Sequence, residues 1–146
     1  MGKCAFCSVA ASERYRVVFE DELALCVLDK YPLVEGHCLI VPKRHAEHLG
    51  ELGDEELLGL MKAVVKAEKA LLALKLGDGV DLRQHYRPFL AESELKVNHV
   101  HFHLLPRRHG DALFEKSLRH EMSLREMNYD RASVGKLAKA ISKAAK

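Results

Sequence analysis

One stretch of the sequence decides the fold: Asn98-His99-Val100-His101-Phe102-His103-Leu104-Leu105-Pro106-Arg107. Its three histidines alternate with apolar residues, and a period of two is typical of a β-strand. On a strand over residues 96–105 the imidazoles would share one face, spaced by about 6.6 Å because each residue advances the chain by about 3.3 Å. Polar rings are costly in a plain core. The pattern therefore predicts a working site on this face.

Length and composition restrict the class of protein. The chain has 146 residues, which suits one domain with one core, and 48% of them are apolar. The net charge of +2 is too small to indicate general nucleic-acid binding. No apolar run approaches the roughly 18 residues of a membrane span, and the first residues lack the pattern of a signal peptide. We therefore expect a cytoplasmic protein with no membrane or nucleic-acid partner, whose cysteines stay reduced.

The remaining pattern predicts an α+β fold with a mainly antiparallel sheet of five strands, because the strands do not alternate regularly with helices. A long helix should follow Asp54 as its N-cap and end at Gly77-Asp78-Gly79. A shorter C-terminal helix should begin near Ala132, with Val134, Leu137 and Ile141 on its apolar side. The expected strands are residues 16–20, 23–28, 37–41 (ended by Pro42), 80–87 and 96–105.

Two kinds of chemistry suit the histidine face. Alternate histidines on a strand can chelate one metal ion through bonds of about 2.0–2.1 Å. Alternatively, a neutral imidazole can attack phosphorus while a neighbouring imidazole holds the phosphate oxygens. The spacing alone leaves both possibilities open.

A second motif, Cys4-Ala5-Phe6-Cys7, is half of a zinc site, because structural zinc takes four ligands. Cys26 and Cys38 lie in apolar strands, so we expect them in the core. The missing ligands would be histidines: His45, His48 or a member of the triad. A redox Cys-x-x-Cys is the rival interpretation, but such a motif usually opens a helix after a strand, and no strand is expected before it.

Together these motifs resemble the histidine triad (HIT) superfamily over nearly the whole chain. Residues 99–107 fit the pattern His-φ-His-φ-His-φ-φ, and residues 36–45 resemble the family's Gly-His-φ-φ-φ-φ-Pro-Lys-x-His strand. The Cys-x-x-Cys resembles the zinc-bearing branch. The resemblance implies a homodimer and a single HIT domain over residues 1–146, with a zinc segment at 1–15 and a C-terminal extension at 108–146.

The resemblance also implies a nucleotidyl hydrolase. His101 would attack the α-phosphorus of a nucleotide and form a nucleotidyl-histidine intermediate, which water would then cleave. His103 would contact phosphate oxygens, His37 would orient the triad, and Asp29 would hold the ribose hydroxyls. Histidine rather than glutamine at position 103 favours hydrolysis over transfer.

In zinc-bearing members the first triad histidine is a metal ligand. The implied site consists of Cys4, Cys7, His45 and His99, with His48 as the chief rival of His45. A closed shell of four ligands leaves no position for a reactive water, so the zinc would be structural. A Mg²⁺ ion would take part only as a companion of the substrate phosphates.

The segment before the triad departs from the family pattern. Many members have Asn-x-Gly…Gly-Gln-Ser/Thr-Val there, whereas this chain has a longer loop with Glu94-Leu95 in place of Gly-Gln. Arg83, Arg87 and Lys96 are cations of this segment that could bind phosphates. A dinucleoside polyphosphate is therefore the favoured substrate, followed by a nucleoside phosphoramidate.

Three alternatives stay open. A dinucleoside polyphosphate phosphorylase or nucleotidyltransferase would use phosphate or another acceptor in place of water. A nucleotide-binding protein without catalysis could share the fold. A metal-centred hydrolase would use His99 and His101 together as ligands.

Overall fold

The computed structural model describes residues 4–93, 95–118, 120–121 and 130–145. They belong to two compact units, Met1–His109 and Gly110–Lys146. Expectations for residues 1–3, for Glu94, and for 119, 122–129 and 146 within the extension lie outside the described residues. The assignment of the whole chain to one domain stays a prediction.

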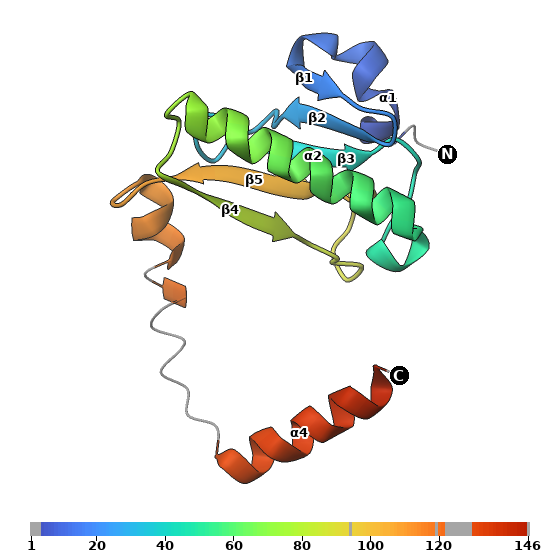
Figure 1. Cartoon of the computed structure of the whole chain (residues 1–146), viewed down its shortest axis with the longest axis vertical. Coiled ribbons are helices and arrows are strands. Elements are labelled where there is room, and N and C mark those ends of the chain that lie inside the picture. Colours follow the sequence, from blue (N-terminus) through green and yellow to red (C-terminus); the bar gives the residue numbers. More distant parts are fainter. Residues whose placement is uncertain (1–3, 94, 119, 122–129, 146) are drawn as a thin grey trace. The chain divides into compact units, whose positions relative to one another are not determined.

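The first unit is built on an antiparallel sheet of five strands in the order β1-β2-β3-β5-β4 (Figure 1). Each neighbouring pair of strands is antiparallel. This arrangement confirms the predicted α+β fold. The strands are β1 (Val17–Glu20), β2 (Ala24–Leu28), β3 (Cys38–Pro42), β4 (Gly79–Gln84) and β5 (Phe102–Arg107).

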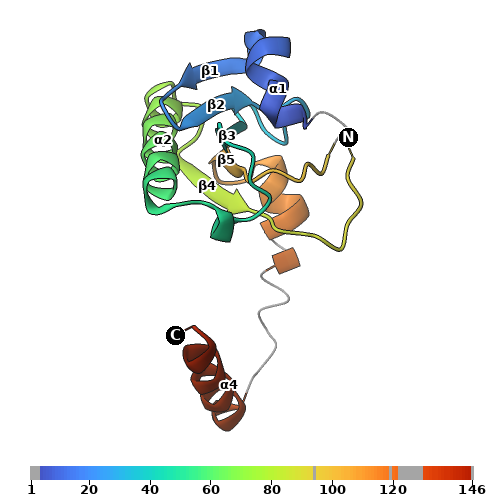
Figure 2. The same cartoon turned by 90° about the vertical axis from the view of Figure 1, so that its right-hand side faces the viewer.

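Two helices cover opposite faces of the sheet (Figure 2). The long helix α2 (Asp54–Ala73) buries Leu60 and Leu71 of its apolar stripe against one face. The short helix α1 (Ala5–Ser12) packs Val9 against the other face. The sheet residues beneath α2 include Cys26, Cys38, Ile40, Phe102 and Leu104, and those on the side of α1 are Leu25, Val27, Leu39 and Val41.

The period of two on β5 decides where the last triad histidine lies. Phe102 and Leu104 point into the core beneath α2. His103 is paired with Leu39 of β3, so it faces the side of α1. The long helix α2 therefore packs on the sheet face opposite to the one that carries His103.

The histidine strand is shorter than predicted, because β5 begins only at Phe102. Before it, the backbone N–H of Val100 donates to the carbonyl of Ala46 at 2.7 Å, and that of His99 donates to Val97 at 2.9 Å. Residues 99–101, before Phe102, therefore do not pair with β3 or β4. The prediction that all three histidines lie on one strand at equal spacing was wrong, because only His103 belongs to β5 and His99 and His101 precede it.

Other boundaries differ for local reasons. The N-cap of α2 is Gly53 rather than Asp54, because the Glu56 carboxylate accepts the Gly53 N–H at 3.0 Å and Asp54 is already helical. β3 includes Pro42 as its last residue, and β4 ends at Gln84 instead of Arg87. Helix α1 was not predicted. A single-turn 3₁₀ helix at Arg14–Arg16 links it to β1, and another at Leu49–Glu51 precedes α2.

The second unit contains a π-helical turn at Phe114–Leu118, which was not predicted, and the expected C-terminal helix α4 (Arg131–Ala144). The Asp130 side chain caps α4 by accepting the N–H groups of Ala132 and Ser133. The predicted apolar side of α4 is exposed. Among the helices that the structure describes, none is long and apolar enough to cross a membrane.

Gly77 provides a test of the packing that holds β4 beside β5. A Cβ at this position would lie 2.6 Å from the backbone nitrogen of Arg107 and 2.9 Å from its carbonyl oxygen. We expect Gly77→Ala to lower the free energy of unfolding by about 1–3 kcal/mol, because the backbone of Arg107 would have to move away from the added methyl group. Gly79→Ala is the control, since its Cβ would meet nothing within 4 Å. Equal urea denaturation midpoints for the two variants would contradict the expected contact.

Candidate active site and metal centre

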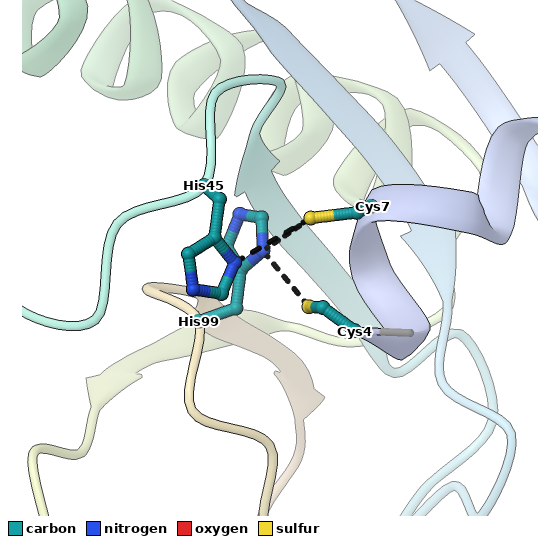
Figure 3. A group of neighbouring side chains, drawn as sticks. All are labelled: Cys4, Cys7, His45 and His99. Atoms are coloured by element: carbon teal, nitrogen blue, oxygen red, sulfur yellow. Dashed lines mark hydrogen bonds between the residues drawn. The ribbon is translucent and has the colours of Figure 1, made fainter. Parts of the chain in front are cut away.

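Four predicted side chains meet where α1 begins (Figure 3). Cys4 precedes the first residue of α1, Cys7 lies in its first turn, His45 follows β3, and His99 precedes β5. One ligand atom of each lies within 4.8 Å of the others. The Nδ1 atom of His99 is 3.3 Å from Cys4 Sγ and 3.6 Å from Cys7 Sγ, and Cys7 Sγ is 3.4 Å from His45 Nδ1. Two thiols and two imidazoles are a donor set that suits a tetrahedral metal ion.

His48, the rival ligand, lies elsewhere. Its Nε2 is 3.1 Å from a carboxylate oxygen of Glu51, and its ring lies against Tyr86 with centroids 5.4 Å apart. It does not belong to the group formed by Cys4, Cys7, His45 and His99.

The hydrogen bond of His99 prepares it as a ligand. Its Nε2–H donates to the carbonyl of Pro42 at 3.0 Å, so Nδ1 keeps the lone pair that faces the two sulfurs. Burial lowers the pKa of His99 to about 4, which keeps the ring neutral.

His101 has the opposite orientation. Its Nδ1–H donates to the backbone carbonyl of His99 at 2.7 Å, which leaves the lone pair on Nε2. Its ring packs edge-on against Phe6 of α1, with centroids 5.0 Å apart. Burial lowers its pKa, while the carbonyl bond and the charge of Asp29 act against this shift. The result is a neutral imidazole with an available nitrogen.

A chain of donors fixes the tautomers of His37 and His103. The backbone N–H of Leu33 donates to Nδ1 of His37 at 3.2 Å, so the proton of the neutral ring lies on Nε2. This Nε2–H points at Nδ1 of His103, 3.0 Å away. His103 therefore carries its own proton on Nε2. Burial lowers the pKa of His37 and is also the first cause of the lowered pKa of His103.

Asp29 lies beside this pair. Its backbone N–H donates to the His37 carbonyl at 2.9 Å, and its Oδ1 accepts the Tyr31 N–H at 2.8 Å. Its Oδ2 is 3.5 Å from His37 Nε2 and 4.0 Å from His103 Nδ1. These three groups are close enough to hold a metal ion. The bond from Leu33 argues against that use, because it leaves no lone pair on His37 Nε2.

Two cavities meet at His101 and His103. The first has a volume of about 540 Å³ and is lined also by Asp29, Phe6 and Leu33. The second has a volume of about 370 Å³, and its wall comes largely from residues of the described ranges 85–93 and 95–98. The two cavities share five lining residues, so His101 and His103 lie on the border between two adjoining spaces; the shared residues are Ser93, Leu95, Val97, His101 and His103.

Two of the three predicted phosphate-binding cations line one of these cavities, and the third lines neither. Arg87 and Lys96 line the second cavity. Arg83, opposite His103 on β4, instead forms an ion pair with Asp81 at 2.7 Å, and Asp81 also holds Arg107. The structure therefore keeps Arg87 and Lys96 as candidates and gives Arg83 a structural partner.

Two features of the site were missed in the sequence. His85 lines the second cavity, and its ring centroid is 5.3 Å from that of His103. Pairing β4 with β5 would have found it, since Arg83 lies opposite His103 and alternate residues share a face. Helix α1 could have been found from the i, i+3, i+4 spacing of Phe6, Val9 and Ala10.

The lowered pKa of His103 predicts a pH effect on stability. Burial, followed by the nearby His101 and His37, lowers it to about 3 from 6.5. As the pH falls below about 6.5 the unfolded chain takes up the proton first, so stability is lost down to about pH 3. The His103→Gln variant lacks this loss. When the pH is lowered from 7.5 to 5.5, we expect the free energy of unfolding of the unmodified protein to fall by roughly 1 kcal/mol more than that of His103→Gln. Urea titrations at both pH values measure this difference. The same difference between the two proteins at both pH values would contradict the claim that His103 is neutral in the folded state.

Comparisons with known proteins agree with this geometry. A model of the HIT domain matches residues 11–110. An uncharacterized HIT-like protein of Methanocaldococcus jannaschii is 41% identical over 74% of this chain and 81% of its own length. An adenosine 5′-monophosphoramidase of Saccharomyces cerevisiae is 36% identical over 72% of this chain and 63% of its own length.

Solved structures show the same similarity. A HIT family protein from Bacillus anthracis matches with a TM-score of 0.74 and 26% identity, covering 99% of both chains. A zinc-bound histidine triad family protein from Mycobacterium smegmatis matches with a TM-score of 0.60 and 32% identity, covering 76% of this chain and 79% of its own. With the histidine motif, the fold and the sequence matches in agreement, this chain belongs to the HIT family.

Proposed function

We propose that this protein is a nucleotidyl hydrolase that cleaves its substrate at the α-phosphate through a nucleotidyl-histidine intermediate on His101. The observation that carries the proposal is the hydrogen bond from His101 Nδ1 to the His99 carbonyl. It places a lone pair on Nε2 of a neutral ring, at the border of two cavities. A nucleophilic imidazole requires this state.

The first step would transfer the nucleotidyl group to the protein. The lone pair of His101 Nε2 forms a P–N bond, and the bond from phosphorus to the leaving group breaks, with its electron pair going to the leaving atom. His103 Nε2–H is the hydrogen-bond donor for the phosphate or for that atom. His37 keeps the proton there, because its own Nε2–H occupies His103 Nδ1.

The second step would release the nucleotide. A water oxygen forms a bond to phosphorus, the P–N bond breaks, and its electron pair returns to Nε2 of His101. The water gives one proton to solvent and its oxygen leaves in the nucleoside monophosphate. Asp29 would bind the ribose hydroxyls in the first cavity, since a carboxylate that accepts one bond from Tyr31 still has free lone pairs.

The favoured substrate is a dinucleoside polyphosphate, and a nucleoside phosphoramidate is second. Arg87 and Lys96 in the second cavity support the first, and the yeast relative named as a monophosphoramidase supports the second. A Mg²⁺ ion would take part only when bound to the phosphates of the substrate. We further propose a cytoplasmic homodimer, on the strength of family membership.

We also propose that the group of Cys4, Cys7, His45 and His99 holds structural zinc. The donor set, the lone pair of His99 Nδ1 and the zinc-bound relative support this assignment. When bound, the ion would cross-link the start of α1 to the segments after β3 and before β5, without an open ligand position.

Product analysis with diadenosine tetraphosphate tests the function. We expect AMP and ATP without added phosphate, and a loss of at least about a thousandfold in kcat for His101→Ala, because the nucleophile is removed. His109→Ala is the matched control, since His109 is exposed and lines neither cavity. ADP formed only with added phosphate would indicate a phosphorylase. Binding without turnover would indicate a protein that binds nucleotides without catalysis.

Elemental analysis tests the metal centre. We expect about one zinc per chain, since the four donors form one closed shell. Cys7→Ser and His45→Ala should lose zinc and lower the melting temperature, because the bound ion stabilises the folded state. His48→Ala should retain zinc, because His48 lies outside the group. Zinc that is lost with His48→Ala but kept with His45→Ala would reverse the assignment.

A further inference from the structure

We infer that the second cavity binds the leaving group of the reaction, and that this leaving group is a nucleoside polyphosphate rather than an amine. The inference rests on the proposed nucleotidyl transfer to His101. It assigns a role to described residues of the segment before the triad (85–93 and 95–98), which departs from the family pattern.

The position of the cavity supports the first part. In phosphoryl transfer the attacking and leaving atoms lie roughly in line through phosphorus, while the nucleoside oxygen lies to the side. With the nucleoside held by Asp29 in the first cavity, the leaving group needs a separate space next to His103. The second cavity is such a space, because His101 and His103 line it as well. Its volume of about 370 Å³ lies within the range of small-molecule sites.

The charges of the lining select an anion. Arg87 donates to Nδ1 of His85 at 3.2 Å, and the ammonium of Lys96 bonds the side-chain oxygen of Asn98. These partners are neutral, in contrast to the carboxylate that Arg83 meets. Glu47 is the acid among the described lining residues. A planar guanidinium and a compact ammonium in the lining of one cavity suit a chain of phosphates.

Tyr86 extends the site beyond the phosphates. Its side chain lines the cavity and is 55% exposed, with one side of the ring against His48. Leu90, 44% exposed, lines the same wall. An accessible aromatic face beside cations is the arrangement on which a nucleic-acid base stacks. The leaving group that fits all three features carries both phosphates and a base.

Three substrates with the same adenylyl group separate these features. Adenosine 5′-phosphoramidate releases ammonia, adenosine 5′-tetraphosphate releases triphosphate, and diadenosine tetraphosphate releases ATP. For Arg87→Gln and Lys96→Met we expect kcat/KM for the two polyphosphates to fall about ten- to a hundredfold more than for the phosphoramidate, as for a lost charge-assisted bond. Lys69→Met, an exposed change on α2, is the control for charge.

Tyr86 has its own comparison. Tyr86→Ala should lower kcat/KM for diadenosine tetraphosphate about tenfold relative to adenosine 5′-tetraphosphate, because only the former has a second base to stack. Tyr86→Phe should keep the ratio. Melting temperature and zinc content verify that each variant folds.

The possible failures are distinguishable. Equal losses on all three substrates, or an unmodified protein that cleaves the phosphoramidate alone, would overturn the leaving-group assignment while the proposed hydrolysis stands. An unmodified protein that cleaves none of the three, or His101→Ala that still cleaves them, would overturn the proposed function itself.

Discussion

The backbone at His99 is the constraint on which the site depends. The side chain of His99 bonds the Pro42 carbonyl through one nitrogen and turns the other toward two thiols. The carbonyl of the same residue accepts the Nδ1–H of His101. One residue thus directs a ring nitrogen into the candidate metal site and also determines which nitrogen of His101 is available. The Val100 N–H bond to Ala46 holds this backbone outside the strand ladder, so that both bonds can form.

Helix α1 joins the same two centres from the other side. Cys4 and Cys7 belong to the candidate metal site, and Phe6 between them packs on the ring of His101. Phe6 also lines the first cavity. A change in the position of the thiols would therefore move a wall of the cavity and a contact of the reactive ring together. A structural ion in this place would act on the chemistry through packing, without touching the substrate.

The sequence predicts much of this arrangement where the signal is local. Alternation on β5 correctly sends Phe102 and Leu104 to the core and His103 to the opposite face, and the helical stripe of α2 locates the support. The start of β5 could not be read from alternation, because it depends on a carbonyl 54 residues away, that of Ala46. The tautomers of His37 and His101 depend likewise on backbone groups, and a pattern of side-chain types does not describe those groups.

The three histidines of the motif are therefore alike in sequence and different in chemistry. His99 turns the lone pair of Nδ1 toward two thiols, His101 has its lone pair on Nε2, and His103 has an N–H at Nε2. A ring nitrogen cannot be donor and lone pair at once, so each partner excludes the other roles for that ring. The surroundings differ as well, because Asp29 lines the first cavity, together with Glu13, Arg16 and Lys30, whereas Arg87 and Lys96 line the second. A carboxylate on one side of the nucleophile and these two cations on the other would give a substrate an orientation, since sugar hydroxyls and phosphates favour different partners.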